Sequence, residues 1–293
     1  MFKRSWLGVA LQVRGSVLPT VLPRSIVCGF MAAAVVLFAQ QNTNLFIPLK
    51  DNLIPSIVLG LLLVFRTNTA YDRFWDGRKC LGTIIISIRN LSRHIWVYGR
   101  GSSQPEREVQ RTILYLLAAI PFVTKHHLRN EPMGEGVKML LPRDRWEQLG
   151  QGGNVPLEVI FWISDYLQSE YQSGCLDVNQ LVAMTGMLDA IVGAIAGCER
   201  ILKTPIPLAY AIHLKQLLLI YCLFLPFQLA KDLGWFAVPV VTIVSFTLLG
   251  IEEIGVEIEN PFGNDANDLP LDGICETVRL NIEDLIRLSP VSQ

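Results

Sequence analysis

The residues best placed to act on ions are a group of charges that follows an apolar segment in the first third of the chain. Residues 53–65, with the sequence LIPSIVLGLLLVF, carry no charge. The charges then begin, and the group comprises Arg66, Asp72, Arg73, Asp76 and Arg78. Such charges could form a vestibule whose field concentrates permeant ions, or they could form salt bridges between subunits. The spacing leaves both interpretations open.

A second group of charges consists of glutamates near the C-terminal end of another apolar segment. Its members are Glu252, Glu253, Glu257 and Glu259. Carboxylates at this spacing could suggest a metal or acid–base site, but no histidine accompanies them. We therefore expect them to pair with the arginines that follow residue 65. Because no nucleophile–base pair, Gly-rich phosphate loop or HExxH motif is found, we expect the protein not to be an enzyme.

One helix is expected to carry both the apolar segment 53–65 and the charges after it, since no Gly or Pro interrupts residues 66–76. Ile57, Leu61 and Val64 are spaced i, i+4 and i+7, which places them on one helix face. On a neighbouring face, Ser56 and Gly60 form a pair of small residues that allows close helix packing in lipid. The pattern suggests several copies side by side, with rings of Ile57 and Leu61 forming an apolar constriction that gates by dewetting. Ordinary lipid-facing or core packing is the alternative.

Composition indicates a protein that lies partly in a membrane and partly in water. The chain has 293 residues, of which 51% are hydrophobic and 17% are charged. A net charge of −1 gives no basic excess for binding nucleic acid. The six cysteines are scattered without metal-ligand or disulfide spacing, so we expect neither a cofactor nor a disulfide framework.

Hydropathy and charge predict four membrane helices, at about residues 25–40, 52–66, 206–230 and 235–251. Residues 67–205 and 252–293 are predicted to be cytosolic and mostly helical. Within them, residues 109–125 are apolar but contain Pro121, and we expect a buried helix. A long helix over about 177–203 is rich in small residues, which implies tight packing. Basic residues near both ends of the first helix pair place both termini on the cytosolic side, and Asn52 is a plausible N-cap at the outer mouth.

Three stretches resemble motifs of the bestrophin family of ion channels, in its bacterial and chloroplast branch. They are VFRTNTAYDRFWDGRK at 64–79, CERILKTPIPLAY at 198–210 and IEEIGVEIENPFGNDANDLPLD at 251–272. The resemblance implies an all-α integral membrane protein in which residues 1–293 form a single channel domain. It further implies a homopentamer around a central pore, with copies of itself, membrane lipid and chloride or other small anions as partners. The membrane would be a bacterial inner membrane or a thylakoid membrane, with the termini in cytosol or stroma.

The same resemblance assigns candidate site residues. The pore neck would be formed by Leu53, Ile57, Leu61 and Val64. A second, cytosolic constriction would lie at Val182. The loop at 264–268 matches a calcium site of animal relatives, but it retains only the carboxylates of Asp265 and Asp268. Calcium prefers six to eight oxygen ligands with substantial negative charge, so we expect no bound metal and a structural turn capped by Asx side chains.

Two other functions stay open at the level of sequence. A cation-selective pore is one, because an apolar neck carries no charge selectivity by itself. A secondary transporter is the other, although transporters typically show internal repeats and this sequence shows none. Chloride conduction down its electrochemical gradient is the function that the resemblance favours.

Overall fold

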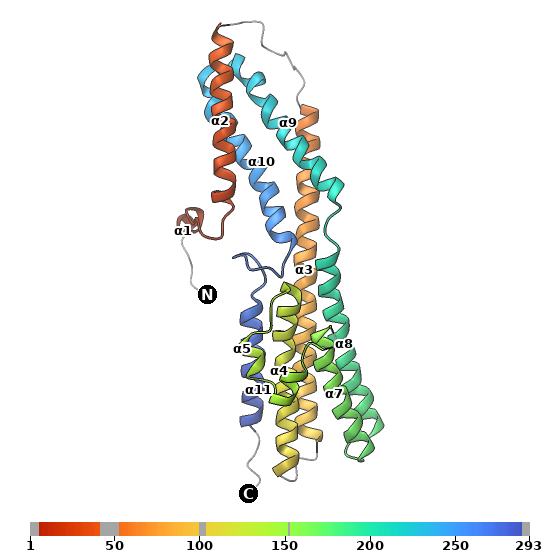
Figure 1. The fold of residues 1–293 in the computed structure, drawn as a ribbon. Helices are drawn as coiled ribbons and strands as arrows, with labels where there is room; N and C mark the ends of the chain where they lie inside the picture. The colour runs from red at the N-terminus through yellow and green to blue at the C-terminus, as the bar shows by residue number, and fades with distance from the viewer. Residues whose placement is uncertain (1–5, 42–52, 100–103, 152, 289–293) are drawn as a thin grey trace. The chain divides into compact units, whose positions relative to one another are not determined.

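The computed structural model describes residues 6–41, 53–99, 104–151 and 153–288, and every regular element among them is helical. By their contacts these residues divide into two units. Unit 1 comprises residues 1–74 and 205–268, and unit 2 comprises residues 75–204 and 269–293. Each unit is therefore assembled from two separate parts of the chain. Helix α3 (Leu53–Tyr98) contributes its first residues to unit 1 and its later residues to unit 2 (Figure 1).

Unit 1 contains the short α1 (Trp6–Ala10), α2 (Leu18–Gln41), the start of α3, α9 (Leu208–Leu233), a 3-10 turn (Gly234–Phe236) and α10 (Ala237–Glu259). Helix α2 begins at Leu18 rather than near the predicted residue 25. Pro19 lies in its first turn, where a residue without an N–H is tolerated because that N–H would have no helical partner.

Helices α2, α9 and α10 pack against one another in unit 1. One buried cluster joins Val35 and Val36 of α2 to Ala230 and Ala237 near the α9–α10 turn. At Gly29 the backbones approach so closely that a Cβ atom would collide with the Thr242 hydroxyl of α10. Small residues thus allow the close helix approach that is typical of packing in lipid.

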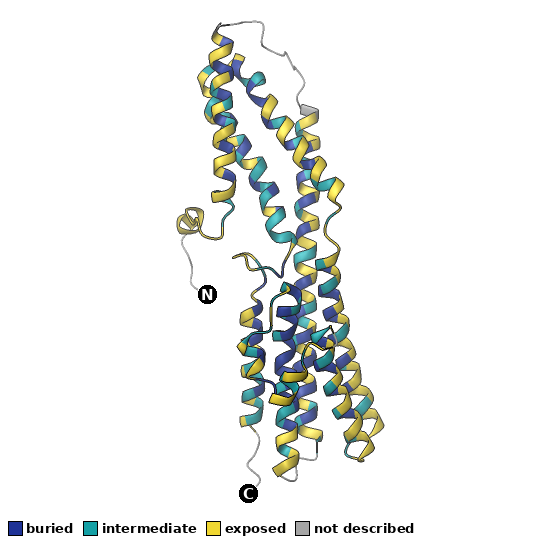
Figure 2. Ribbon diagram, viewed as in Figure 1, coloured by how far each residue is buried: buried dark blue, intermediate teal, exposed yellow. Residues whose placement is uncertain are grey.

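Unit 2 contains the later part of α3, α4 (Gln104–Arg129), α5 (Glu135–Lys138), α6 (Arg143–Gln148), α7 (Val155–Gln172), α8 (Val178–Lys203) and α11 (Leu271–Arg287). Helix α4 packs on α7 and α11, and its residues Leu114, Leu117 and Ile120 are fully buried. The prediction of a buried helix over 109–125 is confirmed (Figure 2).

Helix α8 begins with a complete capping box. The Asp177 carboxylate accepts hydrogen bonds from the backbone N–H groups of Asn179 and Gln180, and the Gln180 side chain accepts one from the Asp177 N–H. The predicted tight packing of small residues holds at Gly197, where a Cβ would lie 2.7 Å from Cys80 Sγ. At Gly186 and Gly193 an added Cβ would instead meet no described atom within 4 Å, so this stripe is not packed tightly along its whole length within the chain.

Three helical stretches among the described residues are long and apolar enough to cross a membrane: Leu18–Gln40, Val178–Lys203 and Leu208–Glu259. The last contains both α9 and α10, and thus two of the predicted membrane helices. The predicted span 52–66 is not among the three; its apolar part in α3 is short, and charged residues follow it. Helix α8, predicted to be cytosolic, is among them by composition, while the structure packs it on α7 and α4 within unit 2.

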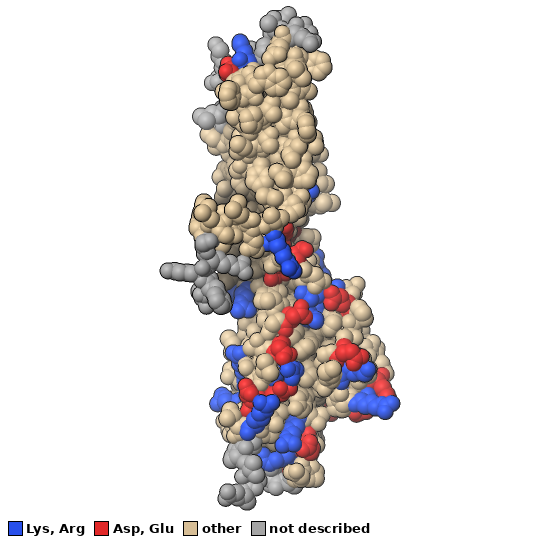
Figure 3. Space-filling view, turned by 90° about the vertical axis from the view of Figure 1, so that its left-hand side faces the viewer, with Lys and Arg blue, Asp and Glu red and all other residues tan. Residues whose placement is uncertain are grey.

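Charge is distributed differently over the two units. On the face shown in Figure 3, the surface over α2 and its neighbouring helices is almost free of Lys, Arg, Asp and Glu. Over the helices of unit 2, both signs of charge are interspersed. An uncharged surface over apolar helices is suited to lipid contact, whereas mixed charge is typical of a surface in water.

Candidate pore-lining helix

The first turns of α3 have one buried and one exposed face. Leu59 and Leu63 are 4% and 1% exposed. Ile57, Leu61 and Val64 are 58%, 54% and 53% exposed. Leu59 and Leu61 therefore lie on different faces of α3, and the exposed side includes Ile57, Leu61 and Val64, the apolar residues predicted to share one helix face.

The buried face of α3 is held by α9. Leu59 and Leu63 form one buried cluster with Leu214 and Leu218 of α9. In water, burying a leucine side chain contributes roughly 1.5–3 kcal/mol to stability. In lipid, the helices are instead held together by van der Waals contacts between their side chains. The orientation of α3 about its own axis is therefore fixed by this contact.

Two hydrogen bonds that involve tyrosines of α9 also join α9 to the start of α3. The hydroxyls of Ser56 and Tyr221 lie 3.1 Å apart. The Tyr210 hydroxyl donates to the backbone carbonyl of Leu62 at 2.9 Å. Neither tyrosine was predicted to be a site residue, although a buried tyrosine hydroxyl usually has a hydrogen-bond partner.

Arg66 is the member of the predicted charge group that lies deepest in the chain. Its side chain is 3% exposed, and its Nη2 donates to Glu259 Oε2 of α10 at 2.7 Å. The other Glu259 oxygen accepts from the backbone N–H of Ile206 at 2.9 Å. Gly255 of α10 lies beside the arginine, since a Cβ there would be in van der Waals contact with Arg66 Cγ at 3.4 Å. The prediction that these glutamates pair with arginines after residue 65 is confirmed at this position.

The remaining charges of the group lie in different surroundings. Arg73 Nε donates to the backbone carbonyl of Glu259 at 3.2 Å. Partial burial lowers the pKa of the Arg73 guanidinium, and the Glu259 carboxylate opposes that shift. Asp76 pairs with Lys79 at 3.0 Å on the helix surface. Asp72 and Arg78 are exposed, so the group is split between a buried anchor around Glu259 and a solvated helix surface.

The other three glutamates have partners outside the predicted arginines. Glu252 lies 3.7 Å from Lys215 of α9, and Glu253 lies 2.8 Å from Arg24 of α2. Glu257 accepts a hydrogen bond from Asn267 Nδ2 at 2.7 Å. Each carboxylate is thus engaged in joining α10 to a neighbouring segment, which was not predictable before the helices were placed side by side.

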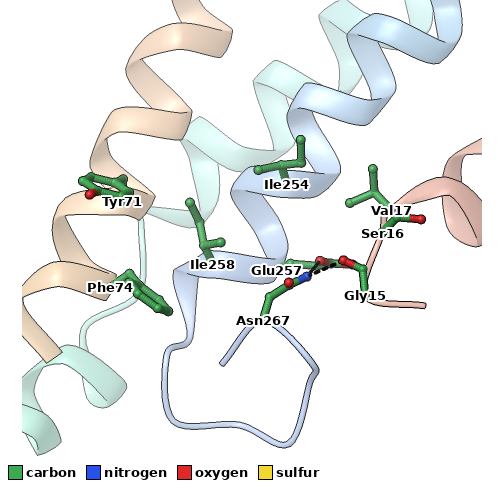
Figure 4. A pocket seen from close by; sticks show the side chains of 9 residues that line it. All are labelled: Gly15, Ser16, Val17, Tyr71, Phe74, Ile254, Glu257, Ile258 and Asn267. Carbon is green, nitrogen blue, oxygen red and sulfur yellow. Dashed lines mark hydrogen bonds between the residues drawn. The ribbon is translucent and has the colours of Figure 1, made fainter. Parts of the chain in front are cut away.

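The loop after α10 is ordered by its Asx side chains. Asn267 Nδ2 contacts both Glu257 and the backbone carbonyl of Gly15, and the three line a hollow with Tyr71 and Ile254 (Figure 4). Asp268 Oδ2 accepts from the backbone N–H of Asp265 at 2.6 Å. These contacts confirm a structural turn. Among the described residues, no group of three or more His, Cys, Asp or Glu side chains could hold a metal ion.

The other predicted site residues lie in separate places. Val182 is 66% exposed on α8 in unit 2, and its role as a second constriction stays a prediction. Leu53 is the first residue of α3, but its side chain lies outside the described part of the structure. Asn52, the predicted N-cap, also lies outside the described residues.

These features define a class of protein: an all-helical protein with long apolar helices, in which one helix is fastened along one face and exposes apolar side chains on the other. Residues 2–284 match the family described as "Bacterial/Fungal Bestrophin protein". The chain therefore belongs to the bestrophin family, as its sequence motifs predicted, and it is a multi-pass membrane protein.

Relatives and solved structures agree with this assignment over nearly the whole chain. The "Voltage-dependent anion channel-forming protein" of Synechocystis sp. is 51% identical over 290 residues, covering 99% of this chain and 94% of the relative. A protein of the same description from Nostoc sp. is 52% identical over 288 residues, covering 98% and 94%. A crystal structure of a point mutant of a bacterial bestrophin homolog from Klebsiella pneumoniae matches with a TM-score of 0.84 and 27% identity, covering 91% of this chain and 99% of that chain.

Proposed function

We propose that the chain is one subunit of a homopentameric anion channel whose pore is lined by α3 from each copy. The observation that carries the proposal is the two-faced start of α3. One face is fastened to α9 and α10 by leucine packing and by the Arg66–Glu259 pair. The other face exposes Ile57, Leu61 and Val64, which no described part of the same chain covers.

The exposed residues would form the neck of the pore. Five copies of Leu53, Ile57, Leu61 and Val64 would give stacked apolar rings. When such rings close to near van der Waals distance, water leaves and an ion would lose its hydration shell, which blocks conduction. The mechanism needs no cofactor and no catalytic group, in agreement with a family of channel-forming rather than enzymatic proteins.

Chloride is the proposed permeant ion, moving passively down its electrochemical gradient. Support comes from relatives described as anion channel-forming proteins. The apolar neck itself acts as a barrier and not as a charge filter.

Four membrane crossings are proposed, by α2, the start of α3, α9 and α10. An even number of crossings places both termini on one side, and the basic residues after the neck assign that side to the cytosol or stroma. The residues of unit 2 would then form a single channel domain with unit 1, with α8 outside the bilayer and Val182 at a second constriction. The membrane would be a bacterial inner membrane or a thylakoid membrane.

Currents through purified protein in a planar bilayer test the proposal. Under a KCl gradient, the reversal potential is expected close to the chloride equilibrium value. A reversal potential close to the potassium value would instead identify a cation-selective pore. Absence of any current, with substrate-dependent exchange in liposomes, would favour a transporter.

A further inference from the structure

A groove in unit 1 is formed where one face of each of three helices converges. It is lined by Arg24, Val27, Cys28 and Met31 of α2, by Lys215, Leu219 and Cys222 of α9, and by Leu249, Glu252 and Glu253 of α10, among others. Together with Leu218 of α9 and Val256 of α10, which also line the groove, the residues on each helix recur at i, i+3, i+4 and i+7, the spacing of a single face. The cavity volume is about 620 Å³, within the range of roughly 300–1,000 Å³ that is typical of small-molecule sites.

The groove is charged at one end and apolar along its remainder. Arg24 lies near the start of α2 and Lys215 in the first turns of α9, while both glutamates lie toward the end of α10. Because the three helix ends meet, all four charges gather at one mouth. From there the lining continues through Cys28 and Met31 along α2, away from the charges, and through Leu219 and Cys222 along α9.

At the mouth, the cations lie outside and the carboxylates lie beneath them. The side chains of Arg24 and Lys215 are 54% and 61% exposed, whereas those of their partners Glu253 and Glu252 are 15% and 6% exposed. An approaching molecule therefore meets two cations first. Both cations thus keep more than half of their side-chain surface exposed although each lies beside a carboxylate, and a guanidinium or ammonium group has several N–H donors.

We propose that this groove binds an anionic phospholipid, with the phosphate at Arg24 and Lys215 and one acyl chain along the apolar lining. Free phosphate would use the mouth but not the long apolar part. A zwitterionic lipid such as phosphatidylcholine would use the apolar part, but its trimethylammonium group would be repelled by the two cations. Basic pockets between membrane helices bind anionic head groups in this manner. The inference goes beyond anion conduction and depends only on unit 1 lying in a bilayer.

Native mass spectrometry of the full-length protein with added phosphatidylglycerol or phosphatidylcholine tests the head-group contact. Wild-type protein is expected to retain phosphatidylglycerol preferentially. Arg24→Gln and Lys215→Gln should each weaken this retention about fivefold, and the double variant should lose the preference. Lys231→Gln, the same charge change near the far end of α9, is the matched control and should leave retention unchanged. Equal retention of both lipids by the wild type, or equal loss in the control, would overturn the proposal.

The thiol of Cys28 gives a second readout that needs no variant. Peptide mapping measures its alkylation by N-ethylmaleimide in nanodiscs made of phosphatidylcholine with or without phosphatidylglycerol. Phosphatidylglycerol is expected to slow the labelling, since the acyl chain covers Cys28. Inorganic phosphate should not, and protection by phosphate alone would overturn the lipid assignment. Complete protection in every lipid until the oligomer dissociates would identify a second copy of the chain as the occupant instead.

Discussion

Two leucines one helical half-turn apart have opposite environments at the start of α3. Leu59 lies in a cluster with Leu63, Leu214 and Leu218. Leu61 is 54% exposed and is not part of that cluster. The same substitution at the two positions therefore separates a role in packing from a role in the pore.

Leu61→Ala is expected to raise conductance or open probability while leaving the fold and the oligomer intact. The change removes three carbon atoms from each of five side chains, so the proposed ring should widen and stay hydrated. Single-channel recording in planar bilayers measures the effect. Leu59→Ala is the control, and it should lower stability by about 2–5 kcal/mol because it leaves a cavity, measured as thermal unfolding in detergent. An open pore in Leu59→Ala with unaltered currents in Leu61→Ala would mean that another face of α3 lines the pore.

Replacing Arg66 by methionine should destabilise the protein strongly. The substitution leaves the Glu259 carboxylate without the partner that lies 2.7 Å away, and breaking a buried pair from one side costs about 3–5 kcal/mol. The exposed pair of Asp76 and Lys79 provides the control, since its side chains are 59% and 62% exposed. Asp76→Ala should change stability by at most about 1 kcal/mol. Similar thermal stability of the two variants would show that the Arg66 pair is not an anchor.

The sequence predicted which helix face a residue lies on better than it predicted which residues that side chain contacts. The spacing of Ile57, Leu61 and Val64 placed them on one face, because helical periodicity is a local property. Charge alone led us to expect that the α10 glutamates pair with arginines after residue 65, and of the four only Glu259 forms such a salt bridge among the described residues. The contacts of Tyr210 and Tyr221 were not expected, because a hydroxyl accepts many partners and only the packing of α9 on α3 selects among them.

At the scale of elements, the sequence predicted the helices well and their ends less well. Residues 177–203 were expected to form one helix, and Asp177 caps that helix in the structure. The start of α2 was placed seven residues too late, near residue 25 instead of Leu18, and the helix contains Pro23. The apolar start of α3 was predicted from its uncharged run of residues 53–65.

The turn after α10 leads to a prediction about calcium. The Asp268 carboxylate accepts a hydrogen bond from the backbone N–H of Asp265 at 2.6 Å, and this bond stabilises the turn. Chelation of calcium should leave channel currents unchanged. Asp268→Ala should cost about 0.5–1.5 kcal/mol through the lost hydrogen bond, without altering gating. Currents that disappear on chelation and return with micromolar calcium would contradict this expectation.

Helix α4 contains a histidine that should make unit 2 sensitive to acid. Burial lowers the pKa of His126, and neighbouring Lys125 lowers it further, against the opposing effect of Glu131. The unfolded chain then binds a proton more readily than the folded one. This contribution to stability is full above the ordinary pKa of about 6.5 and is lost as pH falls from there through the folded value. Thermal unfolding between pH 8 and 5 measures it, and His126→Gln should flatten the profile. An unchanged slope in the variant would assign the acid sensitivity to other groups.

At the scale of the whole molecule, several small residues face open space in the single chain. A Cβ added at Gly60, Gly186 or Gly193 would meet no atom of the described residues within 4 Å. The sequence predicted close packing at such positions, and the described fold of one chain does not supply it there. Assembly would supply it, since copies placed side by side around α3 would bring neighbouring backbones to these faces.

Gly60→Leu tests that assembly, because a Cβ at this position meets no described atom of the single chain within 4 Å, whereas a leucine would occupy space needed by a neighbouring copy. We expect the detergent-corrected mass of the wild type to correspond to five subunits, and the variant to shift toward smaller species while its helical content stays unchanged. Gly29→Leu is the contrasting variant. Its Cβ would already collide with the Thr242 hydroxyl oxygen within the same chain, so it should lower thermal stability and not only assembly. A Gly60→Leu protein that remains pentameric and conducts normally would remove Gly60 from the subunit contact. A wild type that conducts as a monomer or dimer would overturn the shared pore itself, because a single α3 cannot surround an ion.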